Sequence, residues 1–307
     1  MTATGAAASP DADRPLHRPA GSLASPPWSI DLPPERAGWT WTSLKVLDLA
    51  AGAAHQFATG GDEVLVLPLE GGCAVAAEGT VCTLQGRSSV FAAPTDFAYL
   101  PTGTTVTIST ESGGRFAVPG ARAGRRFPFR RRAAQEVAIE LRGTGNCSRR
   151  VVNYCMAGFE ADRLLVCEVF TPSGNWSSYP PHKHDEQTPA ETALEEIYYF
   201  EIASGASGEA GLAYQRVYGP ASRPIDLLAE VRQGDVVQVP HGYHGPSMAA
   251  PGYDLYYLNV MGGAGERQWL ATLDPAHAWV RDTWAVQPVD PRLTAAWPSA
   301  SGAGGHR

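Results

Sequence analysis

The apolar positions of this chain come in short runs rather than in long amphipathic stretches. The runs are rich in Val, Leu, Ile, Phe and Tyr, are divided by Gly, Pro and Asp, and show little helical periodicity. Short apolar segments at this spacing are typical of the strands of an all-β sandwich or barrel. The pattern predicts strands at residues 43–49, 63–69, 89–92, 105–109, 164–171, 196–202, 235–239 and 253–261.

A few stretches depart from this strand pattern. Residues 224–231 and 274–284 have the spacing of short helices. The first thirty residues are mostly Ala, Pro and Ser with scattered charges, and they lack the apolar core of a secretion signal. We therefore expect a disordered tail at the N-terminus and a second tail at the C-terminus.

Six arginines lie close together between the two sets of predicted strands, within residues 122–132. A basic cluster can bind anionic partners, but we favour a solvated linker or an arm that packs on acidic neighbours. A loose pattern of a glycine followed by a proline, at residues 86–94 and 234–240, hints at a duplicated barrel. The predicted organisation is a tail at 1–30, an N-terminal barrel at 31–121, a basic linker at 122–135, a C-terminal barrel at 136–290 and a tail at 291–307.

Composition narrows the class of protein. A chain of 307 residues is long enough for two domains, and a net charge of −7 argues against a nucleic-acid partner. No apolar run approaches the roughly 18 residues of a membrane span. The five cysteines are odd in number and form no Cys-x-x-Cys pair, which favours buried, reduced thiols. We expect a cytoplasmic protein.

The first candidate for chemistry is the pair His182 and His184. Residues i and i+2 of a strand face the same side, so both imidazoles can point at one centre. Such a pair is also common on surface strands and does not by itself identify a metal site. The four histidines at positions 17, 55, 277 and 306 are expected in tails, loops or satisfied core positions.

Further ligands are available downstream of this pair. Glu195 and Glu196 open the next predicted strand, and strand alternation places them on opposite faces without choosing between them. A third imidazole can come from His241 or His244, in a turn that follows a strand. Three imidazoles and a carboxylate make a nitrogen and oxygen site for a divalent first-row metal.

Three segments, residues 174–185, 195–200 and 251–261, give the chain a clear family resemblance. It resembles the 5-deoxy-glucuronate isomerases of myo-inositol catabolism, which are bicupin isomerases like the uronate ketol-isomerase of pectin breakdown. The resemblance extends to shorter matches at residues 38–39, 63, 86–101, 142–143, 149–153 and 279–291. It implies two tandem cupin barrels of the double-stranded β-helix, or jelly-roll, type. It also implies conversion of 5-deoxy-D-glucuronate to 5-dehydro-2-deoxy-D-gluconate.

The resemblance implies four metal ligands, namely His182, His184, Glu196 and His244. Glu196 is preferred to Glu195 because the related isomerases place the ligand directly before an aliphatic–Tyr strand. One residue separates Gly242 from His244, where the usual cupin turn has two, so His241 remains a local rival. We expect one divalent ion per chain, with zinc preferred and manganese or iron as alternatives. The N-terminal barrel has no His-x-His and is expected to be structural and metal-free.

The implied reaction moves a carbonyl from C1 to C2 of a sugar acid. Removal of the C2 proton leaves an enediolate, whose negative charge a Lewis-acidic metal stabilises. A base must then shuttle the proton, and the candidates are Glu195, Lys183, Tyr179 and Tyr256. Lys183 lies between the two ligand histidines and points away from the metal in a regular strand. Arg149 or Arg150 is the candidate for the substrate carboxylate, although either can be an ordinary strand-edge arginine.

Two other functions fit the same site. A cupin dioxygenase can use three histidines and a glutamate to hold iron, and it would require oxygen for turnover. A non-catalytic, sugar-binding cupin would use the metal only as structure, with every metal position filled by the protein. The expected partner is a small sugar acid, and homo-oligomerisation is left open.

Overall fold

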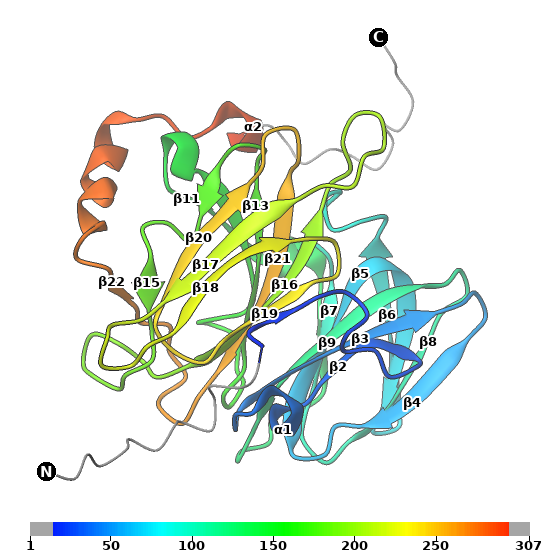
Figure 1. Ribbon diagram of the computed structural model, residues 1–307. Coiled ribbons are helices and arrows are strands. Elements are labelled where there is room, and N and C mark those ends of the chain that lie inside the picture. Colours follow the sequence, from blue (N-terminus) through cyan, green and yellow to red (C-terminus); the bar gives the residue numbers. More distant parts are fainter. Residues whose placement is uncertain (1–14, 295–307) are drawn as a thin grey trace, which may run out of the picture.

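The computed structural model describes residues 15–294, and its regular structure consists mainly of strands that curl into two barrels (Figure 1). This confirms the predicted all-β class. The helical segments are short and lie between or after strands: α1 (Pro34–Ala37), η1 (Ala134–Glu136), η2 (Gly145–Cys147), η3 (Ala278–Val286) and α2 (Pro291–Thr294).

The N-terminal barrel is built around one long strand. Its first side has the strand order β10 (Arg130–Arg132), β7 (Phe97–Leu100), β5 (Asp62–Ala77), β9 (Gly114–Arg122), β3 (Thr42–Leu49) and β2 (Trp28–Leu32). Its second side contains β4 (Ala54–Ala58), β8 (Thr105–Ser109) and β6 (Thr80–Arg87). Because β5 pairs with β7 and β9 at one end and with β6 and β8 at the other, it belongs to both sides.

The C-terminal barrel consists of two facing sheets. The larger has the order β1 (His17–Arg18), β19 (Val236–Val239), β16 (Glu195–Ile202), β21 (Leu255–Gly262), β13 (Leu165–Thr171), β12 (Arg149–Cys155) and β11 (Ala138–Arg142). The smaller has the order β18 (Asp226–Val231), β17 (Ala213–Tyr218), β20 (Tyr243–Ala249), β15 (His182–Lys183) and β22 (Thr272–Leu273), with β14 (Trp176–Ser177) also paired to β20.

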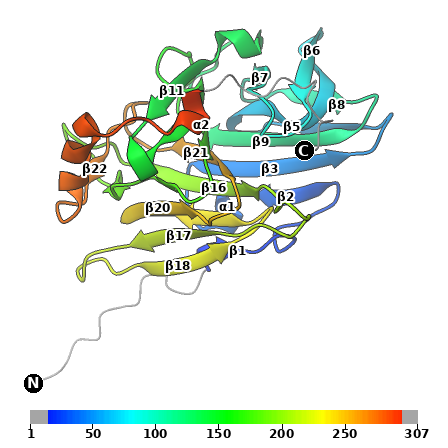
Figure 2. The same ribbon diagram turned by 90° about the horizontal axis from the view of Figure 1, so that it is seen from above.

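The two barrels meet face to face, so that the central strands of the larger C-terminal sheet, β16, β21 and β13, are buried on both sides, whereas its edge strand β11 is exposed. Figure 2 shows the order of the layers: β17 and β20, then β16 and β21, then β3 and β9. Side chains alternate along each strand between two different cores. On β16, Ile197 and Tyr199 belong to the core between the barrels, whereas Tyr198 and Phe200 belong to the interior of the C-terminal barrel. A third apolar cluster fills the N-terminal barrel.

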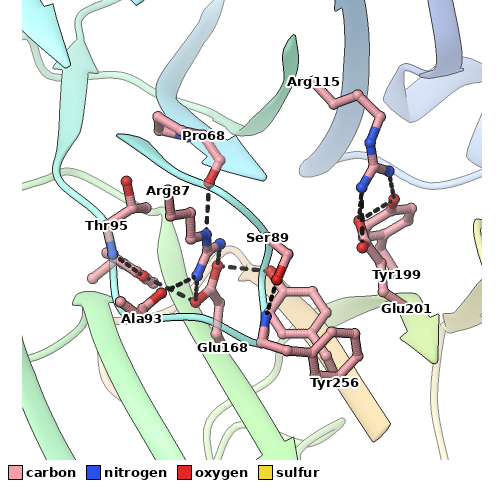
Figure 3. A network of polar contacts seen from close by, with 12 residues as sticks. Pro68, Arg87, Ser89, Ala93, Thr95, Arg115, Glu168, Tyr199, Glu201 and Tyr256 are labelled. Carbon is pink, nitrogen blue, oxygen red and sulfur yellow. Dashed lines mark hydrogen bonds and ion pairs between the residues drawn. The ribbon is translucent and has the colours of Figure 1, made fainter. Parts of the chain in front are cut away.

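Buried ion pairs join the barrels within this interface (Figure 3). The guanidinium of Arg87, at the end of β6, binds both carboxylate oxygens of Glu168 on β13. The hydroxyls of Tyr154 and Tyr256 donate to the same carboxylate at 2.9 and 2.7 Å. Each carboxylate oxygen of Glu168 thus accepts two hydrogen bonds, and its charge is paired with that of Arg87. The cluster can therefore remain buried without an unpaired charge.

Two glutamates tie the backbone of each barrel to the other. Glu63, at the start of β5, accepts backbone N–H groups of residues 162–164 of the C-terminal barrel. Glu195, at the start of β16, accepts backbone N–H groups of residues 40–42 of the N-terminal barrel. Because β5 and β16 hold the same place in their sheet orders, the two contacts are equivalent, which supports a duplicated barrel. Val64 then occupies in the first barrel the position that Glu196 occupies in the second.

Most predicted strands are present, and two local predictions are wrong. Residues 89–92 form a turn, in which the backbone N–H of Phe91 donates to the Ser89 hydroxyl at 3.3 Å. Residues 224–231, predicted as helix, contain strand β18, since their inward positions alternate every second residue. The helical prediction at 274–284 is confirmed in part by η3.

The predicted N-terminal tail also needs correction. Residues 15–30 are ordered, because β1 pairs with β19 of the C-terminal barrel and β2 joins the N-terminal barrel. Of the two alternatives expected for the basic segment, the structure has the arm on acidic neighbours: Arg125 binds Asp162, and β10 pairs with β7. Residues 1–14 and 295–307, which the predicted tails include, lie outside the described part.

Candidate metal centre

Three histidines converge inside the C-terminal barrel. His182, His184 and His244 each bring one imidazole nitrogen to within 4.8 Å of the others. Pairing of β15 with β20 places His182 directly opposite His244, and their ring centroids are 4.5 Å apart. In residues 15–294 this is the one group of three or more His, Cys, Asp or Glu side chains close enough to hold a metal.

The facing sheet supplies a carboxylate to the same point. The Oε2 atom of Glu196, on β16, lies 2.9 Å from Nε2 of both His184 and His244. The Nδ1 atoms of these histidines face the carbonyl oxygens of Leu194 and Gly242, each at 3.3 Å. An Nδ1–H that donates to a carbonyl leaves the Nε2 lone pair directed at the centre, as in many metal sites.

The protonation states of two of these groups, His182 and Glu196, fit metal binding; burial lowers the pKa of His184, but its hydrogen bond to Glu196 outweighs this and raises it. Burial and the neighbouring imidazoles hold the pKa of His182 well below its usual value, so this ring is neutral. Burial opposes ionisation of Glu196, but His244 and His184 outweigh it and lower the pKa of the carboxyl. A neutral imidazole and an ionised carboxylate are the forms that coordinate metals. The donor set therefore fits a divalent first-row metal.

A cavity of about 240 Å³ lies beside this centre, inside the barrel. His182 and Glu196 line it, whereas His184 and His244 lie behind them. Its floor is formed by inward-facing residues of neighbouring strands, namely Arg149, Val151, Asn153, Cys167, Val169, Tyr198, Tyr257, Asn259 and Met261. The rest of the wall consists of loop residues and residues of outer strands, namely Glu140, Arg142, Met156, Ser178, Tyr179, Pro180, Trp269, Ala271, Leu273, Arg281 and Trp284. A molecule in the cavity thus approaches the centre from the side of His182 and Glu196.

Of the four predicted proton shuttles, the structure places only Tyr179 at the cavity. Lys183 forms ion pairs with Asp185 and Glu191, both at 2.9 Å, and points away. Two predictions are corrected by strand alternation. Glu195 faces the N-terminal barrel, and Tyr256 lies in the interface, where it donates to Glu168.

The same alternation separates the two predicted carboxylate-binding arginines. Arg149 lines the cavity, whereas Arg150 faces the other way and donates to the carbonyl of Leu293 at 2.7 Å. The rival ligand His241 does not belong to the histidine group. The imidazole that the structure brings to the centre is that of His244.

Most of the polar lining was not predicted from the sequence. Ser178 contacts the hydroxyls of both Tyr198 and Tyr257 at 3.2 Å, and Asn153 and Asn259 also line the cavity. Tyr198 could have been inferred, because it lies two residues after Glu196 on the same face. The residues on β21 could not, since the register between distant strands has no local signal.

Comparisons with known proteins agree with this geometry. The sequence model of the KduI/IolB family matches residues 16–280. The 5-deoxy-glucuronate isomerase of Geobacillus kaustophilus (strain HTA426) is 40% identical over 257 residues, which is 83% of this chain and 91% of the relative. That of Bacillus subtilis (strain 168) is 39% identical over 245 residues, covering 78% and 88%.

Solved structures give the same grouping. An IolB-like protein from Salmonella typhimurium LT2 superposes with a TM-score of 0.80 at 34% identity, covering 87% of this chain and all of that one. A Bacillus subtilis oxalate decarboxylase superposes with a TM-score of 0.56 at 12% identity, covering 79% of this chain and 74% of that one. At that identity the second likeness concerns the fold alone, and it supports two tandem cupin barrels.

Proposed function

The chain belongs to the KduI/IolB family, and from this we propose that it isomerises 5-deoxy-D-glucuronate to 5-dehydro-2-deoxy-D-gluconate. The observation that carries the proposal is a centre of three histidines and one glutamate beside an internal cavity with polar walls. Relatives about 40% identical over some four fifths of the chain are named for this activity.

We propose that His182, His184, Glu196 and His244 hold one divalent ion, with zinc preferred. Such an ion supplies Lewis-acid stabilisation to the charge that develops on the two adjacent oxygens of an enediolate. His184 and His244 are held from behind by backbone carbonyls, so their direction is fixed before substrate arrives. His182 is partly buried and lines the cavity together with Glu196.

The chain's own groups can bind the hydroxyls of a sugar acid. Burial raises the pKa of the Tyr257 hydroxyl, so it stays protonated and can donate a hydrogen bond. Ser178 holds that hydroxyl in place at 3.2 Å. Tyr179 remains the candidate for moving a proton at its Oη, because it lies in the cavity wall and the other three predicted shuttles do not. Apolar side chains such as Val151, Val169 and Met261 reduce the water in the cavity.

The two alternative functions have less support. The relatives are named as isomerases, which does not favour a dioxygenase. A purely structural metal is disfavoured because part of the ligand set, His182 and Glu196, lines a cavity.

We also propose that the protein acts in the cytoplasm, in myo-inositol degradation, on a small sugar acid and without a nucleic-acid partner. The names of the relatives support the substrate. No helix within residues 15–294 is long and apolar enough to cross a membrane. Sedimentation of the purified protein measures whether the chain forms a homo-oligomer.

The test is an NMR assay of 5-deoxy-D-glucuronate with purified protein of known metal content, run once in air and once anaerobically. The ketose should appear at the same rate with and without oxygen. The variant His182→Ala/His184→Ala should lose both the metal and the ketose signal, because it removes two of four ligands. A requirement for oxygen, or a metal-replete protein that leaves the uronate unchanged, would overturn the proposal.

A further inference from the structure

Within residues 15–294, one buried guanidinium that lines the cavity, that of Arg149, forms no ion pair with the protein. Glu140 lines the same cavity, but its carboxylate is engaged by Arg142 and it acts on Arg149 only through longer-range attraction. Arg149 is 7% exposed, and its side chain points from β12 into the cavity. Its Nη1 donates to the carbonyl oxygens of Cys147 at 2.9 Å and of Tyr179 at 3.3 Å. Within residues 15–294 no carboxylate forms an ion pair with Arg149, and no acceptor is bound by its Nε or Nη2.

The contrast with another buried arginine shows that this arrangement is unusual. Arg87, which is equally buried, has both ends of its fork on Glu168, and this partner outweighs burial and raises the pKa of the guanidinium. Burial instead lowers the pKa of Arg149 to about 10. A charge buried without a partner is costly, and a ligand that brings the opposite charge recovers that cost.

The surroundings hold Arg149 in place. Its guanidinium lies 5.5 Å from the ring centroid of Trp284, on the cavity wall. Gly143, with φ of +73°, leaves the necessary space, because a Cβ there would lie 2.8 Å from Nη1. Two backbone carbonyls and a ring thus fix the group on one side. The free Nε and Nη2 edge has the fork geometry that matches a carboxylate.

A second arginine extends the positive charge to the mouth of the cavity. Arg281 is exposed and lies over the same Trp284 ring at 5.6 Å. Arg142 also lines the cavity, but Glu140 neutralises it through two hydrogen bonds. Arg149 is therefore the inner group and Arg281 the outer group of a path that attracts an anion.

We infer that Arg149 binds the carboxylate of the substrate through Nε and Nη2, so that the cavity selects uronates over neutral aldoses of the same length. This inference rests on the proposed function for the identity of the substrate. When Arg149 binds the carboxylate, the aldehyde at the other end of the substrate can lie at the metal centre, beside His182.

Kinetics with two substrates test the inference. One is 5-deoxy-D-glucuronate, and the other is the neutral aldose that has a hydroxymethyl group in place of the carboxylate. Arg149→Met should raise KM for the uronate about 10- to 100-fold, as expected for a lost charged bidentate contact. The Arg149→Met variant should turn over the neutral aldose at a rate close to that of the wild type. The KM of Arg149→Lys for the uronate should lie between those of the wild type and Arg149→Met. The matched control Arg150→Met should leave both values unchanged.

A binding measurement separates this inference from the proposed reaction. Calorimetry with D-gluconate, and with sorbitol as the neutral control, should show gluconate binding by the full-length protein and a loss of it in Arg149→Met. A protein that never isomerises the uronate but binds gluconate through Arg149 would refute the proposed function and keep the inference. An active enzyme in which a folded Arg149→Met variant keeps the wild-type KM and gluconate affinity would refute the inference alone.

Discussion

At the scale of single residues, strand alternation decides which of two neighbours reaches the cavity. Three adjacent pairs divide between the cavity and the opposite face of the sheet in this way: Arg149 and Arg150, Glu195 and Glu196, and Tyr256 and Tyr257. The alternation itself is predictable from the sequence. Which member points inward is not, because both faces of this sheet are buried and carry the same residue types. Only the family resemblance selected Glu196.

The two glutamates offer a matched comparison. Glu196→Gln should lower metal affinity at least about 10-fold, because it removes the ionised ligand from the centre. Glu195→Gln should keep the metal and lower the thermal midpoint, since its carboxylate accepts backbone N–H groups of the other barrel. Metal content and thermal unfolding of both variants check this. Loss of metal in the Glu195 variant alone would reverse the assignment.

Two tyrosines give a similar comparison for catalysis. Tyr179→Phe should lower kcat at least about 100-fold with little change in KM, if its hydroxyl moves a proton in the transition state. Tyr256→Phe should leave kcat near the wild-type value, because that hydroxyl donates to Glu168 in the interface. Steady-state kinetics on the metal-loaded variants are the measurement. Equal, small effects on kcat would remove Tyr179 from the reaction.

At the scale of secondary structure, the centre depends on how β20 fits against its neighbours. Most strands were predictable from apolar runs, but the pairing of β15 with β20 was not, since the two lie some sixty residues apart. The wrong prediction at 224–231 has a local cause. The apolar residues of this segment are compatible with a helical spacing. The strand alternation becomes visible only in the structure, where Ala229 and Val231 pack into the core.

Gly245, the residue after His244, tests this fit. A Cβ at this position would lie 1.8 Å from the carbonyl oxygen of Ser178, and its φ is +94°. Gly245→Ala should therefore lower both the thermal midpoint and metal affinity. Gly252→Ala is the control, because it has the same φ of +94° and nothing within 4 Å. It should show only the backbone strain, about 1–2 kcal/mol, and normal metal binding. Similar behaviour of the two variants would argue against steric control of the site.

At the scale of the whole molecule, the two-barrel architecture was predictable, but the way the barrels meet was not. The interface core contains Leu, Val, Ile and Tyr, as the barrel interiors do. A single sequence therefore gives no sign that an apolar position belongs to one or the other. The interface differs from the barrel interiors most clearly in its buried ion pair, Arg87 and Glu168. These two residues lie 81 positions apart in the sequence, so the pairing has no local signal.

This buried pair should contribute strongly to stability when only one partner is removed. Arg87→Met should lower the free energy of unfolding by about 3–5 kcal/mol, because Glu168 is left charged and buried. The double variant Arg87→Met/Glu168→Leu should recover part of that loss. Asp226→Asn, at an exposed pair with Arg216, should change little. Urea unfolding measures all three, and a single variant as stable as the wild type would show that the pair does not hold the barrels together.

The central claim is that one metal centre in the C-terminal barrel performs the isomerisation. It is tested most directly by following 5-deoxy-D-glucuronate by NMR with one protein sample before chelation, after removal of the metal and after addition of one equivalent of zinc. The account predicts ketose formation, its loss on chelation and its return with zinc while the protein stays folded throughout. Unchanged ketose formation by the folded, metal-free protein would contradict it.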